Sequence, residues 1–167
     1  MVKSLLSVVL FCASVLTLSA QAETLQHAES GLQFDVPDGW KHESAEDLLV
    51  ATNGDGDLVV LIFVAKADSA EEFLKGMGEE LGKIIKDAKI TEGPKEEKIN
   101  ELTQEFIEGT GKPVGRKAKG EEDAAEVDWH MTVVHGGKKL MVAVAFGNLT
   151  DDGEKVAALY NSIKKIK

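Results

Sequence analysis

The sequence predicts an α+β fold built on an antiparallel β-sheet of about six strands that is buried on both faces. Residues 126–148 form two alternating runs around a Gly-Gly link at 136–137, which is typical of a tight β-hairpin. Residues 58–65 are apolar at every position, so this strand has no face suited to water. Apolar residues at helical spacing in 68–88 and 150–166 predict two helices.

The hairpin predicts its own register if the two glycines form the turn. Val133 then faces Leu140, and the apolar side chains on this face form a core. The second face carries His130, which this register places opposite Ala143. A partly buried histidine beneath a closely packed helix is one interpretation. The alternative is a shallow ligand-binding pocket with His130 as its polar group.

The remaining segments follow from local patterns. Ser69 and Glu72 form a capping box at the start of the first helix, and Pro94 excludes a helix from the charged segment that follows. Glycines interrupt the first helix, and we expect Gly82→Ala to raise stability if that glycine is only tolerated. In chain order the sequence predicts a lead-in at 23–30, strands at 32–36, 48–52, 58–65 and 102–108, polar or charged connections at 41–47 and 89–100, and a loop at 109–123.

Residues 1–22 are predicted to be a signal peptide. Lys3 precedes an apolar run at 5–18, and Ala20-Gln21-Ala22 is a small-x-small cleavage site, so we expect cleavage after Ala22. An uncleaved anchor is the alternative, but the run is short for a membrane span. The prediction is a periplasmic or secreted protein in which residues 23–167 form a single domain.

Charge and cysteine content restrict the function. The formal net charge is −10, which argues against nucleic acid or an anionic membrane surface as a partner. The one cysteine, Cys12, lies in the predicted signal peptide, so the exported chain has no disulfide and no cysteine nucleophile. Because cleavage would remove the apolar run at 5–18, we expect no stable membrane insertion of the exported chain.

No motif predicts catalysis, a cofactor or a bound metal. The alternation of Asn53, Asp55 and Asp57 resembles the opening of a calcium loop, but Leu58 replaces the required glycine, so a turn is favoured and weak calcium binding stays open. The Gly-Thr-Gly-Lys run at 109–112 lacks the other residues of a phosphate loop. The four histidines have no metal-site spacing.

One basic patch interrupts the acidic chain. Lys112, Arg116 and Lys117 lie in the loop predicted at 109–123. A solvated loop is one interpretation. A docking loop for an acidic partner is the functional hypothesis, because loops often carry binding residues.

The run Phe34-x-Val36-Pro37-x-Gly39-Trp40, the Gly-Thr-Gly segment after a strand and the Gly-Gly hairpin before a terminal helix together resemble the Mog1/PsbP-like superfamily. The resemblance extends over nearly all of 31–167. It implies an α/β/α arrangement, with an antiparallel sheet sandwiched between helices. Relatives include a Ran-binding import factor, a photosystem II accessory subunit and a periplasmic protein linked to phage adsorption. They share no catalytic residues, so no site residue is carried over.

We expect a non-enzymatic periplasmic accessory protein that contacts another protein of the cell envelope. A small-ligand or lipid-binding carrier that uses the sheet face around His130 is the alternative, and an enzyme is the third possibility. Affinity capture and native mass spectrometry would separate the first two. The oligomeric state stays open, since a sheet edge can pair with a second copy.

Overall fold

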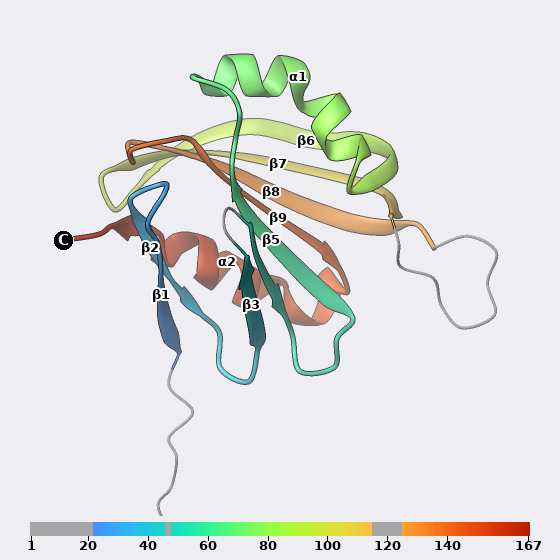
Figure 1. Ribbon diagram of the computed structural model, residues 1–167. Coiled ribbons are helices and arrows are strands. Elements are labelled where there is room, and N and C mark those ends of the chain that lie inside the picture. The colour runs from blue at the N-terminus through green and yellow to red at the C-terminus, as the bar shows by residue number, and fades with distance from the viewer. Residues whose placement is uncertain (1–21, 46–47, 115–124) are drawn as a thin grey trace, which may run out of the picture.

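The computed structural model describes residues 22–45, 48–114 and 125–167. All of the predicted signal peptide except Ala22 lies outside these ranges. The described residues form an α+β fold (Figure 1). Its elements are β1 (Glu23–His27), β2 (Leu32–Val36), β3 (Lys41–Ala45), β4 (Leu48–Thr52), β5 (Leu58–Val64), α1 (Ala70–Gly82), β6 (Ile85–Ile99), β7 (Leu102–Pro113), β8 (Val127–His135), β9 (Met141–Gly147), α2 (Leu149–Ser162) and β10 (Lys164–Lys165).

The main sheet has seven strands in the order β3-β4-β5-β9-β8-β7-β6, and each neighbouring pair is antiparallel. A second sheet of three strands has the order β1-β2-β10. The prediction of about six strands missed both outer strands of the large sheet. It also missed the small sheet, apart from β2.

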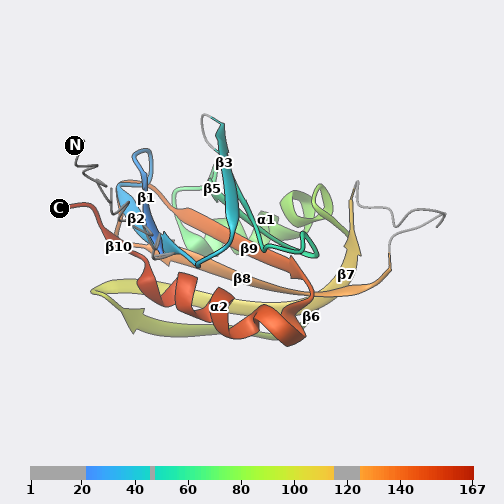
Figure 2. The same ribbon diagram turned by 90° about the horizontal axis from the view of Figure 1, so that it is seen from below.

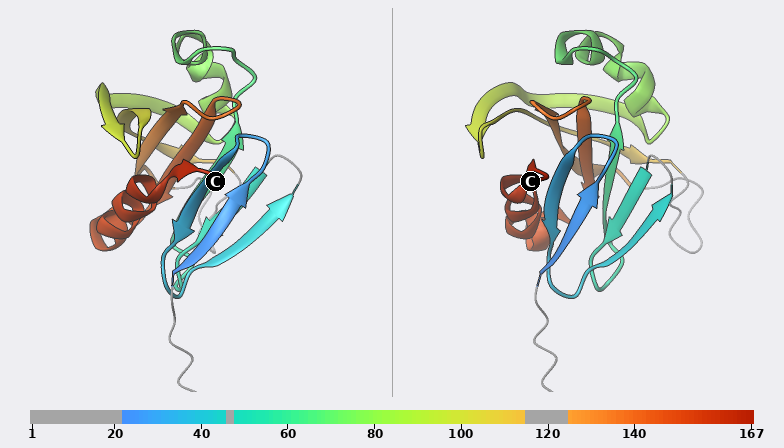
Figure 3. Two further views of the ribbon diagram at one scale, coloured as in Figure 1. Left: turned by 90° about the vertical axis from the view of Figure 1, so that its left-hand side faces the viewer. Right: turned by 60° about the vertical axis from the view of Figure 1, so that its left-hand side comes forward.

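Both faces of the main sheet are buried at its centre, as the apolar run in β5 predicts. Ile62 belongs to a core cluster with α2, whereas Val59 belongs to a separate cluster with α1. The three-stranded sheet shares the α2 face and adds Phe34, which has no exposed surface. Figure 3 shows α1 on one side of the large sheet, with α2 and the small sheet on the other. The sandwich therefore has a helix on one face, and a helix plus a small sheet on the other.

The β8–β9 hairpin has the predicted faces but a different register. Val133 pairs with Val142, and His130 pairs with Ala145, so each partner lies two residues beyond the predicted one. The turn is longer because it docks on the small sheet, where the backbone N–H of Lys138 donates to the carbonyl oxygen of Ser30 at 2.7 Å. A shift of two residues keeps every side chain on its predicted face.

The segment after the first helix was predicted wrongly. The helix ends at Gly82, and residues 85–99 form the edge strand β6 in place of a charged connection. Nearly all side chains of β6 are exposed, so it has no alternation of polar and apolar residues. An edge strand also tolerates Pro94, because half of its N–H groups have no partner strand. On the next strand, β7 runs to Pro113, so residues 109–113 are not a loop.

Three smaller differences concern segments that pair across the chain. The predicted lead-in contains β1, the polar segment after Trp40 contains β3, and the last helix ends at Ser162 because β10 pairs with β2. One half of the capping box is confirmed: the Glu72 N–H donates to Oγ of Ser69 at 3.2 Å, whereas Oε2 of Glu72 accepts from the N–H of Asp68 at 3.1 Å rather than from that of Ser69. In the described part of the chain, neither helix has the length and apolar character needed to cross a bilayer.

Candidate functional site

A groove lies between α2 and the outer strands of the main sheet, and we call it the α2 groove. Its volume is about 380 Å³, and it is half open to solvent. Figure 2 shows α2 running beside β7 and β6. The lining residues are Lys95, Glu97, Phe106, Ile107, Glu108, His130, Met131, Gly153, Val156, Ala157, Tyr160 and Asn161.

The groove exists because α2 covers only part of its sheet face. The helix packs over β2, β8 and β9, where Ala143 and Ala145 allow close approach and are fully buried. Beyond β8 the sheet continues through β7 to β6, and within the described residues the main packing of α2 does not extend over these two strands. On the groove side of α2, Gly153 and Ala157 lie one turn apart and contribute little bulk. The uncovered sheet and the small helical residues together leave the hollow.

Buried polar contacts hold α2 at this position. The hydroxyl of Tyr160 donates to the carbonyl oxygens of His130 at 3.0 Å and Ala143 at 3.4 Å. Burial raises the pKa of the Tyr160 phenol far above its usual value, so this group stays a donor. Gln104 is fully buried, accepts from Oγ1 of Thr132 at 3.3 Å and donates to the carbonyl oxygen of Tyr160 at 3.3 Å. In the sequence, Gln104 is a polar residue between the apolar Leu102 and Phe106. Its two hydrogen bonds join the sheet to the helix.

The groove has an apolar floor. The rings of Phe106 and Tyr160 lie with their centroids 6.4 Å apart and their planes inclined by 37°. Phe106 is only partly buried, so part of its surface stays accessible, and Val156 continues the apolar surface on α2. An apolar floor of this kind suits the stem of a long side chain or a small hydrophobic group.

The rim of the groove carries an excess of carboxylates. Nε2 of His130 lies 4.0 Å from Oε2 of Glu108, and the two side chains are 36% and 46% exposed. Lys95 forms an ion pair with Glu92, and Glu97 lies on the same strand. The hydrogen bond that the Lys95 ammonium donates to Glu92, followed by the negative charges of Glu92, Glu108 and Glu97, raises the pKa of Lys95. Three carboxylates therefore surround a single lysine.

The lining combines apolar side chains with charged and polar ones. The lining contains no Ser, Thr or Cys side chain. Among the residues that the structure describes, no group of three or more His, Cys, Asp or Glu side chains could hold a metal ion. What the groove offers is an apolar surface with charged side chains above it.

Of the basic patch predicted at Lys112, Arg116 and Lys117, the structure describes only Lys112. Lys112 lies in β7 rather than on a loop, and it is paired directly with Lys86 of β6. The basic patch therefore includes a lysine that the sequence pattern did not connect with it. Arg116 and Lys117 lie outside the described residues.

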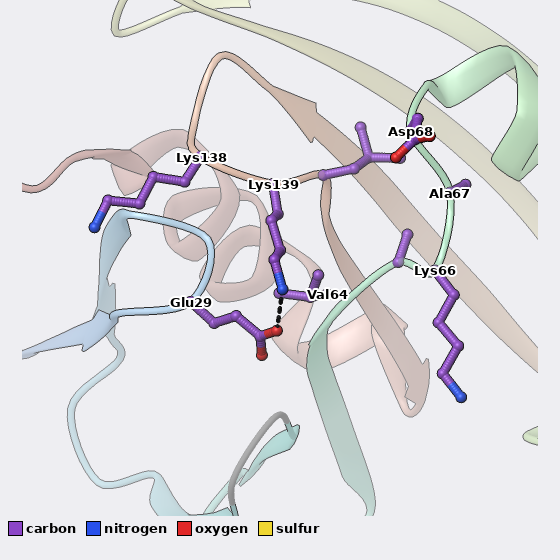
Figure 4. Close-up of a pocket in the computed structure, with 9 residues that line it drawn as sticks. Glu29, Val64, Lys66, Ala67, Asp68, Lys138 and Lys139 are labelled. Atoms are coloured by element: carbon purple, nitrogen blue, oxygen red, sulfur yellow. Dashed lines mark hydrogen bonds and ion pairs between the residues drawn. The ribbon is translucent and has the colours of Figure 1, made fainter.

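A second hollow, of about 450 Å³, contains three lysines, and Figure 4 shows it. Nζ of Lys139 lies 2.6 Å from Oε1 of Glu29, and this hydrogen bond lowers the pKa of the Glu29 carboxyl. Lys138 and Lys66 point away from this pair in different directions. The three ammonium groups do not converge, so they form no single anion site.

The loop at residues 53–57 is a turn that anchors the start of α2. Nδ2 of Asn53 donates to Oδ1 of Asp57 at 2.5 Å and to Oδ2 of Asp152 at 2.7 Å. Its Oδ1 accepts from the N–H of Leu58 at 3.1 Å. Asp152 also binds Lys155 at 2.7 Å. These contacts explain Asn53 and Asp57 as groups that hold the turn and the start of α2.

Comparison with known proteins agrees on the fold. The solution structure of the cyanobacterial PsbP protein CyanoP from Synechocystis sp. PCC 6803 matches with a TM-score of 0.60 and 9% identity, over 88% of this chain and 94% of that protein. The fold is Mog1/PsbP-like. A crystal structure at 1.50 Å of a protein from Bacteroides thetaiotaomicron VPI-5482 matches with a TM-score of 0.52 and 12% identity. That match covers 88% of this chain, which spans 49% of the Bacteroides protein.

No protein-family model and no curated protein sequence matches the chain. At identities of 9% and 12%, the structural likeness concerns the fold alone. The PsbP-like fold therefore agrees with the resemblance drawn from the Phe34–Trp40 run and the hairpin. It assigns no site residue in this chain.

Sequence reasoning found His130 but not its surroundings. Strand alternation places His130 on the α2 face, as expected. Glu108 had been assigned to the end of a strand without a function, and Lys95 and Glu97 to a connection. The signal that could have located the last two is the balance of Lys and Glu between Pro94 and Asn100, which is common on protected edge strands.

Proposed function

We propose that this protein is an exported, non-enzymatic accessory protein that binds another protein of the cell envelope. The observation that carries the proposal is the α2 groove, which joins an apolar floor to an acidic rim and is half open. A groove that is open to solvent suits a segment of a larger partner, because small ligands usually have most of their surface buried in their site. The localisation rests on the signal pattern at residues 1–22.

Affinity capture tests this proposal. The tagged protein is incubated with envelope extract, and the bound material is quantified by mass spectrometry. We expect one protein in near-stoichiometric amount. Absence of any such protein at low and physiological salt would contradict the proposal. The intact mass of the purified protein checks export, since cleavage after Ala22 removes residues 1–22.

A small-ligand or lipid carrier is the second candidate. The observation in its favour is that His130, a polar group able to orient a ligand, lines a groove of about 380 Å³, within the usual range for small-molecule sites. Native mass spectrometry of the purified protein distinguishes the two. A reproducible mass increment that disappears in His130→Ala favours the carrier, whereas a bare mass with a captured protein favours the accessory function.

A further inference from the structure

We propose that the α2 groove and the adjoining free edge of β6 hold an extended basic segment of the partner protein, added as a further strand to the main sheet. This inference rests on the proposed function and specifies its site and the chemistry of its partner. It uses two features that adjoin each other: the backbone of residues 95–99 and the side chains of the groove.

The backbone of residues 95–99 is suited to pairing with another strand. Among the strands that the structure describes, β6 is the last of the main sheet, so no described strand pairs with one of its edges. Pairing with β7 shifts register three times between Lys86 and Lys95, but it is continuous from Lys95↔Phe106 to Ile99↔Leu102. Within the described residues, no backbone hydrogen bond reaches the outer edge of 95–99. A regular edge of this kind is the template for strand addition.

The side chains of the same residues lead into the groove. Lys95 is paired with Phe106 and therefore shares the α2 face with it, and Glu97, two residues on, lies on the same face. In an added strand, every second side chain would point to this face. Phe106 lies two strands away from the added strand, at about 10 Å. Only a long side chain crosses that distance, which favours Arg or Lys.

The charges around the groove also favour Arg or Lys in the added strand. Lys95 forms its ion pair with Glu92, whereas Glu97 and Glu108 act on it only through their charges, and Glu108 also lies 4.0 Å from Nε2 of His130. An arginine could lay its apolar stem across β6, place its guanidinium beside these carboxylates and contact the ring of Phe106. An acidic segment would be repelled. The net charge of −10 steers basic segments toward the protein as a whole.

The test uses fluorescein-labelled peptides of about nine residues in which threonine alternates with arginine, and a counterpart with glutamate in place of arginine. Fluorescence anisotropy measures their binding to the purified protein. We expect the arginine peptide to bind at least about tenfold more tightly than the glutamate peptide at physiological salt. Equal binding would overturn the proposal.

N-methylation separates strand addition from attraction by charge alone. Two arginine peptides carry N-methyl groups on alternate amides, one peptide in each frame. A strand uses only every second N–H group to pair with its neighbour. One frame should therefore lose binding, while the other retains it. Equal effects in both frames would show that no strand is added, and would overturn the proposal.

Matched variants locate the site. Glu97→Lys should weaken arginine-peptide binding by about tenfold, because it reverses a charge inside the groove. Glu96→Lys makes the same change of net charge on the opposite face of β6, where Glu96 is paired with Glu105, and should have little effect. Thermal unfolding checks that both variants fold. If both weaken binding equally, attraction is non-specific and the proposed site is wrong.

Envelope capture then tests the accessory function and the groove site separately. Loss of the partner in Glu97→Lys but not in Glu96→Lys supports the groove as its site. Retention of the partner by both variants leaves the accessory function standing and overturns this inference. Failure of the wild-type protein to capture any partner overturns the accessory function, and this inference with it.

Discussion

Gly109 is the position at which the sheet should tolerate a side chain least. It is paired directly with Trp129, which is fully buried and donates from Nε1 to the carbonyl oxygen of Thr110 at 3.0 Å. A Cβ at position 109 would lie 2.5 Å from Cε2 of Trp129 and would also meet its Cζ2 and the carbonyl oxygen of Lys89. The indole cannot move without disturbing its buried contacts, and the backbone of β6 at Lys89 cannot move without disturbing its pairing with β7.

We therefore expect Gly109→Ala to destabilise the protein by about 2–3 kcal/mol, in the upper part of the range of about 1–3 kcal/mol for overpacked cores. For a domain of this size, the corresponding fall in Tm is about 5–10 °C. Guanidinium unfolding followed by tryptophan fluorescence and far-UV circular dichroism measures the change. Gly78→Ala is the control, because its added methyl group meets no atom within 4 Å and should not destabilise α1.

A double-mutant cycle identifies the source of the strain. Trp129→Leu is itself destabilising, but in that background Gly109→Ala should cost at least about 1 kcal/mol less. The remaining cost would reflect the carbonyl oxygen of Lys89. An equal cost in both backgrounds would refute the role of Trp129. A stable Gly109→Ala variant would refute the close approach altogether.

Three further predictions concern the helices. Gly82→Ala should raise the free energy of unfolding by up to about 1 kcal/mol, because an added Cβ meets no atom within 4 Å; a fall in Tm would contradict this. The Lys155 ammonium, followed by the Asn53 amide, lowers the pKa of Asp152, so its stabilisation is complete above the unfolded pKa of about 4 and is lost as the pH falls through the lower folded value. Asp152→Asn should thus be less stable than wild type at pH 7, and denaturation at several pH values should show this difference shrinking toward low pH; a constant difference would argue against the linkage. Tyr160→Phe should cost about 1 kcal/mol through its lost hydrogen bonds, measured as a lower denaturant midpoint at unchanged slope, and an unchanged midpoint would count against them.

Local sequence patterns predict only part of the α2 groove. Alternation along β8 placed His130 on the α2 face, because side-chain direction in a strand has a period of two. The pairing partner was misplaced by two residues, because the turn length depends on a hydrogen bond to Ser30, more than a hundred residues earlier in the chain. Glu97 and Glu108 join the site only through pairing between β6, β7 and β8.

The sequence by itself determined the elements that have one or two apolar faces. β5, the hairpin strands and the two helices are predictable, because burial imposes a period on their residues. Tertiary structure decided the polar strands β1, β3 and β6. They lie at sheet edges, where burial does not impose the two-residue repeat of a strand on the sequence. It also decided the hairpin register and the part of the sheet that α2 leaves uncovered. Each of these depends on a contact between segments far apart in the chain, which no local pattern encodes.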